Sequence, residues 1–320
     1  MRAATAPPGR LFRRRSGSVA GARLSWAPRR FIRGGPVEQQ DDPRTIVITG
    51  ASDGIGAAAA RRLRGDGHEV VVVGRSAEKT AAVARPLGAR HFSADFARLA
   101  DVRRLAGELR EAVPRVDVLV NNAGGIFDRR ELTEDGHETT WQVNHLAPFL
   151  LTQLLLDRLL ESRAAVVNTS SVAARLGRFR PEDLGDDRRW SPQRAYGDTK
   201  LANILFARGL ARRHGEQGLA AAAFHPGGVA TNFASSTSTP LRFLYGTRLG
   251  RRLMISPERG AETLVWLAEG TAGRDWESGG YYEKKRPART NPRAHDDALA
   301  DALWQRSAEL VGLSPGPSAR

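Results

Sequence analysis

Short apolar runs that alternate with helical periodicity constrain the fold of this chain most strongly. Residues 70–73 are four consecutive valines, and residues 116–120 are apolar except for Asp117. A strand that is apolar at successive positions is buried on both faces, as in a parallel sheet covered by helices on both sides. We predict an α/β fold whose strands span residues 44–49, 69–74, 90–93, 116–120, 164–169, 219–225 and 280–283, with helical runs between them.

The ends of the chain differ from this pattern. Residues 1–43 hold nine arginines and three acidic residues without sustained periodicity, which predicts a disordered Arg-rich extension. Two alternatives stay open: the composition also resembles an organellar transit peptide, and Val37 is compatible with a GTG start codon in a GC-rich genome. No repeat or linker interrupts residues 44–313, so we predict one domain there, followed by a tail at 314–320.

Composition excludes several functions. The chain has no cysteine, and its seven histidines lack metal-ligand spacing, so we expect no disulfide, thiol nucleophile or metal centre. The formal charge of +14 comes from basic residues scattered along the chain with few aromatics, so we expect no nucleic-acid partner. No apolar run approaches the roughly 20 residues of a membrane span and no secretory signal is recognisable, so we expect a cytoplasmic protein.

A glycine-rich turn follows the first strand at residues 49–56 and leads directly into a helix. Glycines there permit a tight turn and close backbone approach, so a pyrophosphate can lie on the helix N-terminus, where free N–H groups and the dipole favour an anion. The turn therefore predicts a dinucleotide site, although a plain strand–helix loop is the alternative. Its candidate contacts are Gly50, Ser52, Gly54, Ile55 and Gly56.

Arg75 follows the second strand, where a dinucleotide fold contacts the adenosine ribose. An acid there would bind the free 2′-hydroxyl of NAD, whereas Arg75 can pair with a 2′-phosphate, so NADP(H) is preferred and NAD(H) is possible. Asp53, within the glycine-rich turn, adds a negative charge near the phosphates and therefore weakens the preference for NADP(H). Asp95, after the third strand, can accept from the adenine amine or be a surface acid.

Tyr196 and Lys200 stand four residues apart in an apolar-periodic run and therefore share one helix face. A phenol of ordinary pKa near 10 is a poor proton carrier at neutral pH, and a nearby cation lowers that pKa. The pair can then exchange a proton with a carbonyl or an alcohol.

Three features share a characteristic order and spacing: the glycine-rich turn, the segment Asn122, Ala123 and Gly124 after the fourth strand, and the Tyr196/Lys200 pair. In these features the chain resembles the short-chain dehydrogenase/reductase family, over about residues 44–313. The resemblance implies a Rossmann-type doubly wound, seven-stranded parallel sheet of order 3-2-1-4-5-6-7 with helices on both faces. It also implies that cofactor and substrate lie at the carboxyl edge of the sheet.

The resemblance assigns roles by position. The catalytic set is Asn144, Ser171, Tyr196 and Lys200, with Ser170 the rival of Ser171 and a buried polar residue at a helix kink the alternative for Asn144. Tyr196 and Lys200 also contact the cofactor, as do Asn122, Ala123 and Gly124. After the sixth strand, the implied cofactor contacts are Pro226, Gly227, Val229 and Thr231, while His225 is interpreted as structural.

Several features are similar to the retinol-dehydrogenase-like branch. They include the long spacing from Ser171 to Tyr196, the sequence Asn144-His145-Leu146 and the run 200–203, although the apolar N-terminal anchor of membrane-bound branch members is absent. Residues 231–255 should cover the substrate, and their apolar side chains favour a lipophilic ligand. Paired asparagines, as in residues 121–122, can also simply fasten the strand.

The sequence thus predicts an NADP(H)-dependent oxidoreductase that interconverts a small-molecule carbonyl compound and its alcohol. The alternative is a non-catalytic NADP-binding regulator or scaffold with the same fold. The resemblance further implies a homodimer or homotetramer that pairs through the helix carrying Tyr196 and the helix before it.

Overall fold

The computed structural model describes residues 43–185, 190–227 and 255–314. Three parts of the chain lie outside these ranges: nearly all of the predicted N-terminal extension, most of the segment predicted to cover the substrate, and residues 315–320. The candidate cofactor contacts Val229 and Thr231 lie outside them as well.

The described strands form one sheet of order β3-β2-β1-β4-β5-β6-β7-β8. All neighbours from β3 to β7 pair in parallel, which confirms the predicted fold and strand order. The strands are β1 (Thr45–Thr49), β2 (Glu69–Gly74), β3 (Arg90–Ser93), β4 (Val118–Asn121), β5 (Ala165–Thr169), β6 (Ala220–His225), β7 (Tyr281–Glu283) and β8 (Arg286–Pro287).

The sheet has eight strands where seven were predicted. Strand β8 pairs antiparallel with β7, so that Glu283 lies opposite Arg286. The two residues between them, Lys284 and Lys285, have φ of 52° and 60°. A two-residue hairpin turn requires this left-handed backbone and normally takes Gly or Asn, so two lysines gave no signal for the eighth strand.

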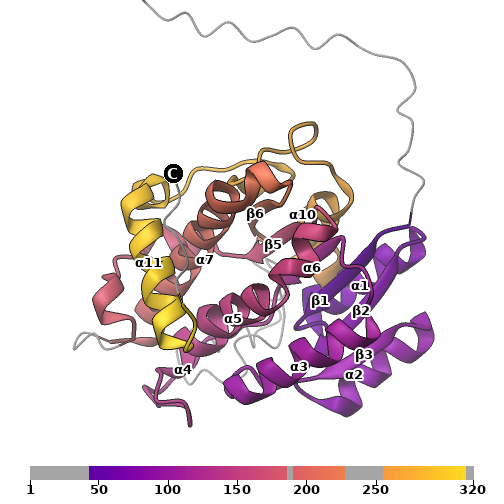
Figure 1. Ribbon diagram of the computed structural model, residues 1–320, viewed down its shortest axis with the longest axis horizontal. Coiled ribbons are helices and arrows are strands. Elements are labelled where there is room, and N and C mark those ends of the chain that lie inside the picture. The colour runs from indigo at the N-terminus through magenta and orange to yellow at the C-terminus, as the bar shows by residue number, and fades with distance from the viewer. Residues whose placement is uncertain (1–42, 186–189, 228–254, 315–320) are drawn as a thin grey trace, which may run out of the picture. The chain divides into compact units, whose positions relative to one another are not determined.

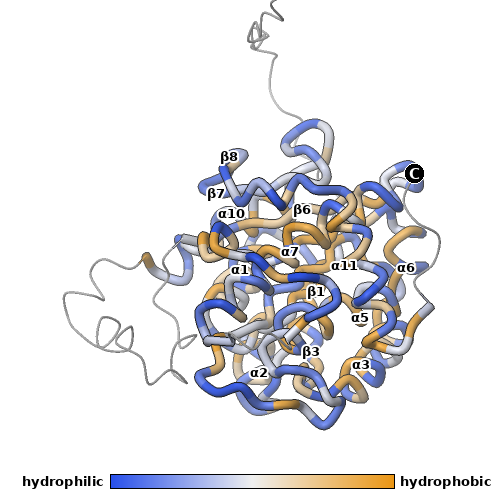
Figure 2. The backbone as a smooth tube through the Cα atoms, turned by 90° about the vertical axis from the view of Figure 1, so that its left-hand side faces the viewer, coloured by the Kyte–Doolittle hydropathy of each residue, from blue (hydrophilic) through white to orange (hydrophobic). Residues whose placement is uncertain are grey.

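Alternate side chains of the strands enter two separate cores. Val47, Val71 and Leu119 pack in one core with α3, α5, α7 and α11. Ile46 and Val70 pack in the other with α1 and α10. Figures 1 and 2 show the helices around the sheet and the hydrophobic stretches concentrated inside the fold. The helices are α1 (Gly54–Gly65), α2 (Ala77–Ala84), α3 (Leu99–Ala112), α4 (Thr139–Trp141), α5 (Ala147–Leu154), α6 (Leu156–Glu161), α7 (Pro192–His214), α10 (Pro257–Glu269) and α11 (Asp297–Leu310).

Helix α11 packs against α5 and α7 (Figure 1). The Trp304 ring lies 5.2 Å from the Phe149 ring of α5 and 5.8 Å from the Phe206 ring of α7, measured between centroids. The Arg213 guanidinium stacks on the same indole at 4.4 Å. All three rings are buried, so the side chains of α5 and α7 at this face are covered by the chain's own C-terminal helix.

Candidate active site

The glycine-rich turn between β1 and α1 is shaped by its glycines. Gly50 and Gly54 have φ of 65° and 55°, a backbone that L-residues adopt at a cost. A Cβ on Gly56 would lie 2.5 Å from the Gly50 carbonyl oxygen, so only glycine fits where α1 begins. The first turn of α1 carries no acidic side chain. This compact turn against a helix N-terminus fits a bound pyrophosphate.

Asp53 is the N-cap of α1. Its carboxylate accepts from the Gly54 N–H at 2.7 Å. This bond gives the acid a local structural role within the turn, since a capping carboxylate satisfies one of the free N–H groups at the start of a helix.

Arg75 lies exposed directly after β2, beside the glycine-rich turn. A Cβ on the preceding Gly74 would come within 2.7 Å of the Ser52 Cβ, so the end of β2 abuts the turn. Asp95 forms a loop contact, its Oδ1 accepting from the Ala97 N–H at 3.0 Å. The structure therefore brings Arg75 and Ser52 to the same part of the sheet edge, while one Asp95 oxygen holds its own loop.

Asn122 ties three strand ends together. Its side-chain amide donates to the Thr49 and Gly50 carbonyl oxygens at 3.0 and 3.2 Å. Its oxygen accepts from the Thr169 hydroxyl at 3.3 Å. These bonds occupy the side chain with β1 and β5, so the geometry favours the fastening role over a direct side-chain contact with the cofactor.

Tyr196 and Lys200 lie on α7, as their spacing predicts. The Lys200 ammonium lies 5.4 Å from the centroid of the Tyr196 ring. It donates to the Thr169 carbonyl oxygen at the end of β5, at 3.1 Å. Only 1% of Lys200 is exposed, and this burial lowers the pKa of Lys200 to about 7. Lys200 is therefore a buried amine, with its charged form disfavoured by burial, that lies at the carboxyl edge of the sheet next to a half-buried phenol.

Asn144 lies in a single π-helical turn, Gln142–Leu146, that connects α4 to α5. Its Oδ1 accepts from the Gly125 N–H at 2.8 Å, and its amide donates to the Gly125 carbonyl at 2.9 Å. A Cβ on Gly124 would lie 2.8 Å from the Asn144 Oδ1 and 3.4 Å from the Lys200 Nζ. Gly124, Asn144 and Lys200 therefore meet at one point, and π-turns of this kind are frequent at functional sites.

The two serines after β5 have different partners. The Ser170 hydroxyl is buried and donates to the Lys200 carbonyl oxygen at 2.7 Å. The Ser171 hydroxyl accepts from the Ala173 N–H at 3.2 Å, which leaves its own hydrogen free to donate. A Cβ on Gly197 would lie 2.9 Å from the Ala173 carbonyl oxygen, so the segment after Ser171 packs against α7 beside Tyr196. The geometry favours Ser171 as the residue that faces a substrate oxygen.

Ser171→Ala is expected to lower kcat by about 10²-fold to 10³-fold, the usual loss when one donor to a developing oxyanion is removed. Ser170→Ala is the matched control, and it should reduce thermal stability because a buried bond to α7 is lost, with kcat changed less than tenfold. Steady-state kinetics and thermal melts of both variants check this. A larger loss of kcat in Ser170→Ala than in Ser171→Ala would reverse the assignment.

The end of β6 supplies the remaining described candidates. Gly227 has φ of 91°, and a Cβ there would lie 2.7 Å from the Ile255 Cδ1. Pro226 precedes it at the carboxyl edge of the sheet, half-buried. Burial lowers the pKa of His225, which therefore stays a neutral imidazole at neutral pH. This fits the structural interpretation of His225.

Sequence reasoning gave no role to three buried polar residues beside this site. His145 and Asn203 appear in the predicted branch features only as sequence letters, and Ser307 gave no signal. The structure places all three in a hydrogen-bonded row that ends at the Thr169 carbonyl, the acceptor of Lys200. For Asn203 alone a signal existed, because the helical periodicity of α7 places it about one turn beyond Lys200.

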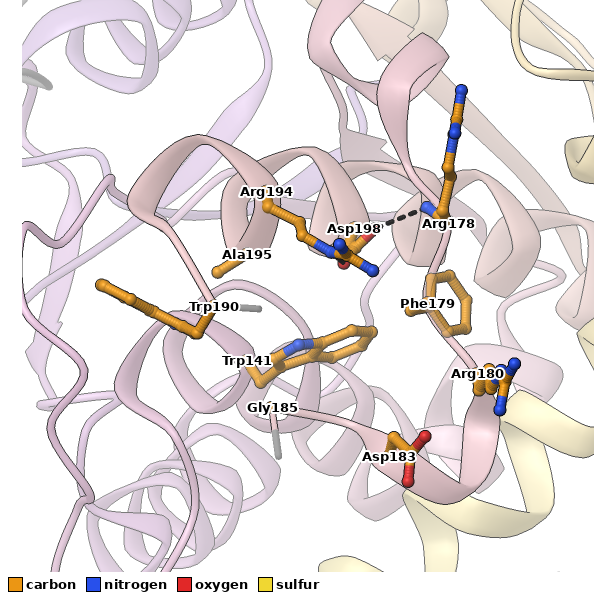
Figure 3. Close-up of a pocket in the computed structure, with 10 residues that line it drawn as sticks. All are labelled: Trp141, Arg178, Phe179, Arg180, Asp183, Gly185, Trp190, Arg194, Ala195 and Asp198. Carbon is orange, nitrogen blue, oxygen red and sulfur yellow. Dashed lines mark hydrogen bonds and ion pairs between the residues drawn. The ribbon is translucent and has the colours of Figure 1, made fainter. Parts of the chain in front are cut away.

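A cavity of about 270 Å³ lies against α7. Asp198 accepts from the Arg178 N–H at 2.6 Å at its rim, and Trp141 forms a wall (Figure 3). Asp198 lies two residues from Tyr196 and therefore points to the other side of the helix. This cavity is distinct from the grouping of Tyr196, Lys200 and Asn144. Its lining residues are Trp141, Arg178, Phe179, Arg180, Asp183, Gly185, Trp190, Arg194, Ala195 and Asp198.

None of the helices in the described ranges combines the length and apolar character that crossing a membrane requires. The same ranges hold no group of three or more His, Asp or Glu side chains arranged to bind a metal ion.

Comparison with known proteins identifies related sequences. The family model described as short chain dehydrogenase matches residues 44–241. A provisionally named daunorubicin C-13 ketoreductase of Streptomyces sp. (strain C5) is 44% identical over 84% of this chain and 93% of its own length. Human retinol dehydrogenase 13 is 35% identical over 95% of both chains.

Solved structures agree with these sequence matches. The crystal structure of an uncharacterized protein from Mycobacterium paratuberculosis has a TM-score of 0.69 and 34% identity, and the match covers 87% of this chain and 98% of that one. An NADP active-site complex of Pseudomonas aeruginosa RhlG has a TM-score of 0.58 and 28% identity, over 74% of this chain and 93% of that one.

Proposed function

Because this chain belongs to the short-chain dehydrogenase/reductase family, in its retinol-dehydrogenase-like branch, and is an oxidoreductase of carbonyl and alcohol groups, we propose that it uses NADP(H) to act on lipophilic substrates. One observation carries the proposal. Lys200, Tyr196 and Asn144 converge at the carboxyl edge of the sheet, beside the glycine-rich turn. A protein that only bound a dinucleotide would not need a buried lysine there, because burying a cation costs free energy.

Each residue has a chemical role in this proposal. The nicotinamide, when bound, supplies or accepts the hydride. The glycine-rich turn would hold its pyrophosphate. Tyr196 gives its phenolic proton to the substrate oxygen during reduction, and the nearby Lys200 cation stabilises the phenolate that remains. Ser171 donates a hydrogen bond to the same oxygen as negative charge develops on it.

The lipophilic substrate class is supported by side chains next to Ser171. Val172 and Leu176 are 47% and 72% exposed, although both are large apolar residues. Exposed apolar side chains beside a reaction site favour an apolar ligand over water. The relatives named for daunorubicin and retinol reactions are consistent with this class. Oxidation of NADPH and of NADH over lipophilic aldehydes, ketones and quinones tests the proposal, and turnover with none of them would contradict it.

The preference for NADP(H) rests on Arg75. Arg75→Glu is expected to lower kcat/KM for NADPH by about 10-fold to 100-fold, since a hydrogen bond to a charged group contributes roughly 1.5–3 kcal/mol. The value for NADH should change little or rise, because a carboxylate can accept from the free 2′-hydroxyl. Arg85→Glu, an equal charge change on another exposed arginine, is the control. An equal loss for both cofactors in Arg75→Glu would contradict the preference.

Location and assembly complete the proposal. We place the protein in the cytoplasm and retain a homodimer or homotetramer as its assembly. Because α11 covers the inner face shared by α5 and α7, we propose that subunits pair through another surface. Light scattering of the purified chain measures the number of subunits.

A further inference from the structure

A row of buried polar side chains runs from α11 to the anchor of the catalytic lysine. The Ser307 Oγ lies 2.9 Å from the His145 Nε2, and the His145 Nδ1 lies 3.3 Å from the Asn203 Oδ1. The Asn203 amide donates to the Thr169 carbonyl oxygen at 3.1 Å. None of the three side chains is more than 4% exposed. Buried polar groups are costly unless they are hydrogen-bonded, so the row must be satisfied as a unit.

The directions of the hydrogen bonds in the row follow from the Thr169 carbonyl, which can only accept. Because the Asn203 amide nitrogen faces a carbonyl, its oxygen faces His145, and the His145 Nδ1 must carry the hydrogen. Burial lowers the pKa of His145 to about 4, so the ring is neutral and carries only that one hydrogen. The His145 Nε2 then accepts from the Ser307 hydroxyl at 2.9 Å, and the single hydrogen of that hydroxyl is shared with the Leu303 carbonyl oxygen, to which it donates at 2.7 Å.

The Thr169 carbonyl oxygen therefore accepts two hydrogen bonds. One comes from the Asn203 amide and the other from the Lys200 Nζ, each at 3.1 Å. If the Asn203 amide turned over, its oxygen would face the Thr169 oxygen, and the two acceptors would repel each other. The orientation of one buried amide thus decides whether Lys200 shares its acceptor with a second donor.

We propose that His145 and Asn203 are positioning residues that fix the Thr169 carbonyl and thereby set the position and charge state of Lys200. Ser307 completes the row from α11, 162 residues after His145 in the chain but in hydrogen-bond contact with it. The functional part of this inference rests on the proposed oxidoreductase reaction. Neither His145 nor Asn203 touches the reacting atoms in this assignment.

The surroundings of Lys200 make its ionisation a specific reporter. Burial alone accounts for its lowered pKa. Tyr196, from the same helix, is the titratable side chain placed against it. Gly124 lies next to Lys200 on the β4 side, and Asn144 lies close by in the π-turn. Neither residue has a titratable side chain. The strand β5 contributes the Thr169 carbonyl. A change in hydrogen bonding at that carbonyl should therefore be visible in the titration of Lys200.

The small number of lysines makes a direct measurement practical. The chain has four lysines, so the full-length protein labelled with ¹³C at lysine Cε gives four side-chain signals, and the Lys200→Met spectrum identifies one of them. In His145→Leu, the Asn203 amide loses its orienting partner, and the Thr169 carbonyl becomes free to accept more strongly from Lys200. We expect the Lys200 midpoint to rise by about 0.5 pH unit or more, because hydrogen bonding to the charged form favours that form.

Three further variants separate positioning from packing. His145→Gln can donate to Asn203 and accept from Ser307, so it should return the midpoint toward the wild-type value. Ser307→Ala removes one hydroxyl and is a milder change, which should raise the midpoint in the same direction. Thr152→Val, another buried polar residue, should lower thermal stability and leave the midpoint unchanged. The proposal would be overturned if folded His145→Leu and Ser307→Ala both kept the wild-type Lys200 midpoint. If His145→Leu does not fold, a wild-type Lys200 midpoint in Ser307→Ala alone would overturn it.

Kinetics provide the second readout. In His145→Leu we expect kcat, expressed per NADPH-binding site, to fall about tenfold while KM changes less than threefold. In His145→Gln we expect kcat to recover toward the wild-type value. Unchanged kcat in a folded variant whose Lys200 midpoint has moved would overturn the functional part. The NMR titration needs no turnover, so absence of activity in the wild-type protein would contradict the proposed reaction without affecting the positioning result.

Discussion

Replacing Tyr196 with phenylalanine is expected to lower kcat about 10³-fold or more while the dissociation constant for NADPH changes less than threefold. The substitution removes one oxygen from a half-buried ring on α7 and leaves the ring itself in place. General acid–base catalysis contributes about 10²-fold to 10⁴-fold to typical enzymes, so loss of the proton donor should remove a factor of that order. The Lys200 ammonium, 5.4 Å from the ring centroid, would then have no phenolate to stabilise.

A second tyrosine provides the control for this variant. The Tyr282 hydroxyl donates to the Glu277 carbonyl oxygen at 3.0 Å, in the core on the α1 and α10 side of the sheet. Tyr282→Phe should therefore lower stability by about 1 kcal/mol and leave kcat unchanged. Single-turnover measurements with saturating NADPH compare the two variants. Retention of more than a tenth of the wild-type rate in Tyr196→Phe would refute its role as the proton donor.

Much of the fold was predictable because it depends on local pattern. A continuous apolar strand such as residues 70–73 has no solvated face, so it can lie only inside a covered sheet. Once the strands are parallel, every carboxyl end falls on one edge, and residues after β1, β4, β5 and β6 must meet there. The meeting of Gly50, Asn122 and Thr169 follows from this topology, and their hydrogen bonds confirm it.

The parts that escaped prediction depend on side-chain direction or unusual backbone. The turn at Lys284 and Lys285 uses positive φ without glycine or asparagine, so no residue type announced β8. The π-turn around Asn144 shifts that side chain toward Gly124 and Gly125, and no periodicity marks a single wide turn. The hydrogen-bond partner of each side chain could not be predicted either, because adjacent residues such as Ser170 and Ser171 are chemically identical.

Asn122 is a second residue whose hydrogen-bond partners decide between two roles. A paired asparagine after a strand is compatible both with cofactor contact and with fastening of the strand. Only the positions of the Thr49 and Gly50 carbonyls show that its amide is already engaged. The residue thereby fastens the start of the glycine-rich turn to the end of β4. This is a role that motif spacing cannot distinguish from direct binding.

Replacing Lys200 with methionine is expected to abolish turnover and to stabilise the cofactor-free protein. A buried lysine whose pKa falls from 10.5 to about 7 opposes folding by about 4 kcal/mol at pH 7, since each unit corresponds to roughly 1.4 kcal/mol. Loss of the bond to the Thr169 carbonyl returns about 1 kcal/mol of that gain. The carbonyl keeps its bond from Asn203, so no buried acceptor is left without a partner. A net gain of about 2–3 kcal/mol should result.

The pH dependence of this gain identifies its cause. The unfolded chain binds the Lys200 proton more tightly than the folded one, so the wild-type protein loses stability as the pH falls from 10.5 toward 7. The advantage of Lys200→Met should therefore be largest below pH 7 and should disappear near pH 10.5. Lys79→Met, on an exposed helix face, should change the unfolding free energy by less than about 0.5 kcal/mol at any pH. Denaturant titrations at several pH values measure all three proteins. A pH-independent difference between wild type and Lys200→Met would assign the effect to packing of the methionine side chain, whereas convergence at high pH would show that the charge of Lys200 itself opposes folding.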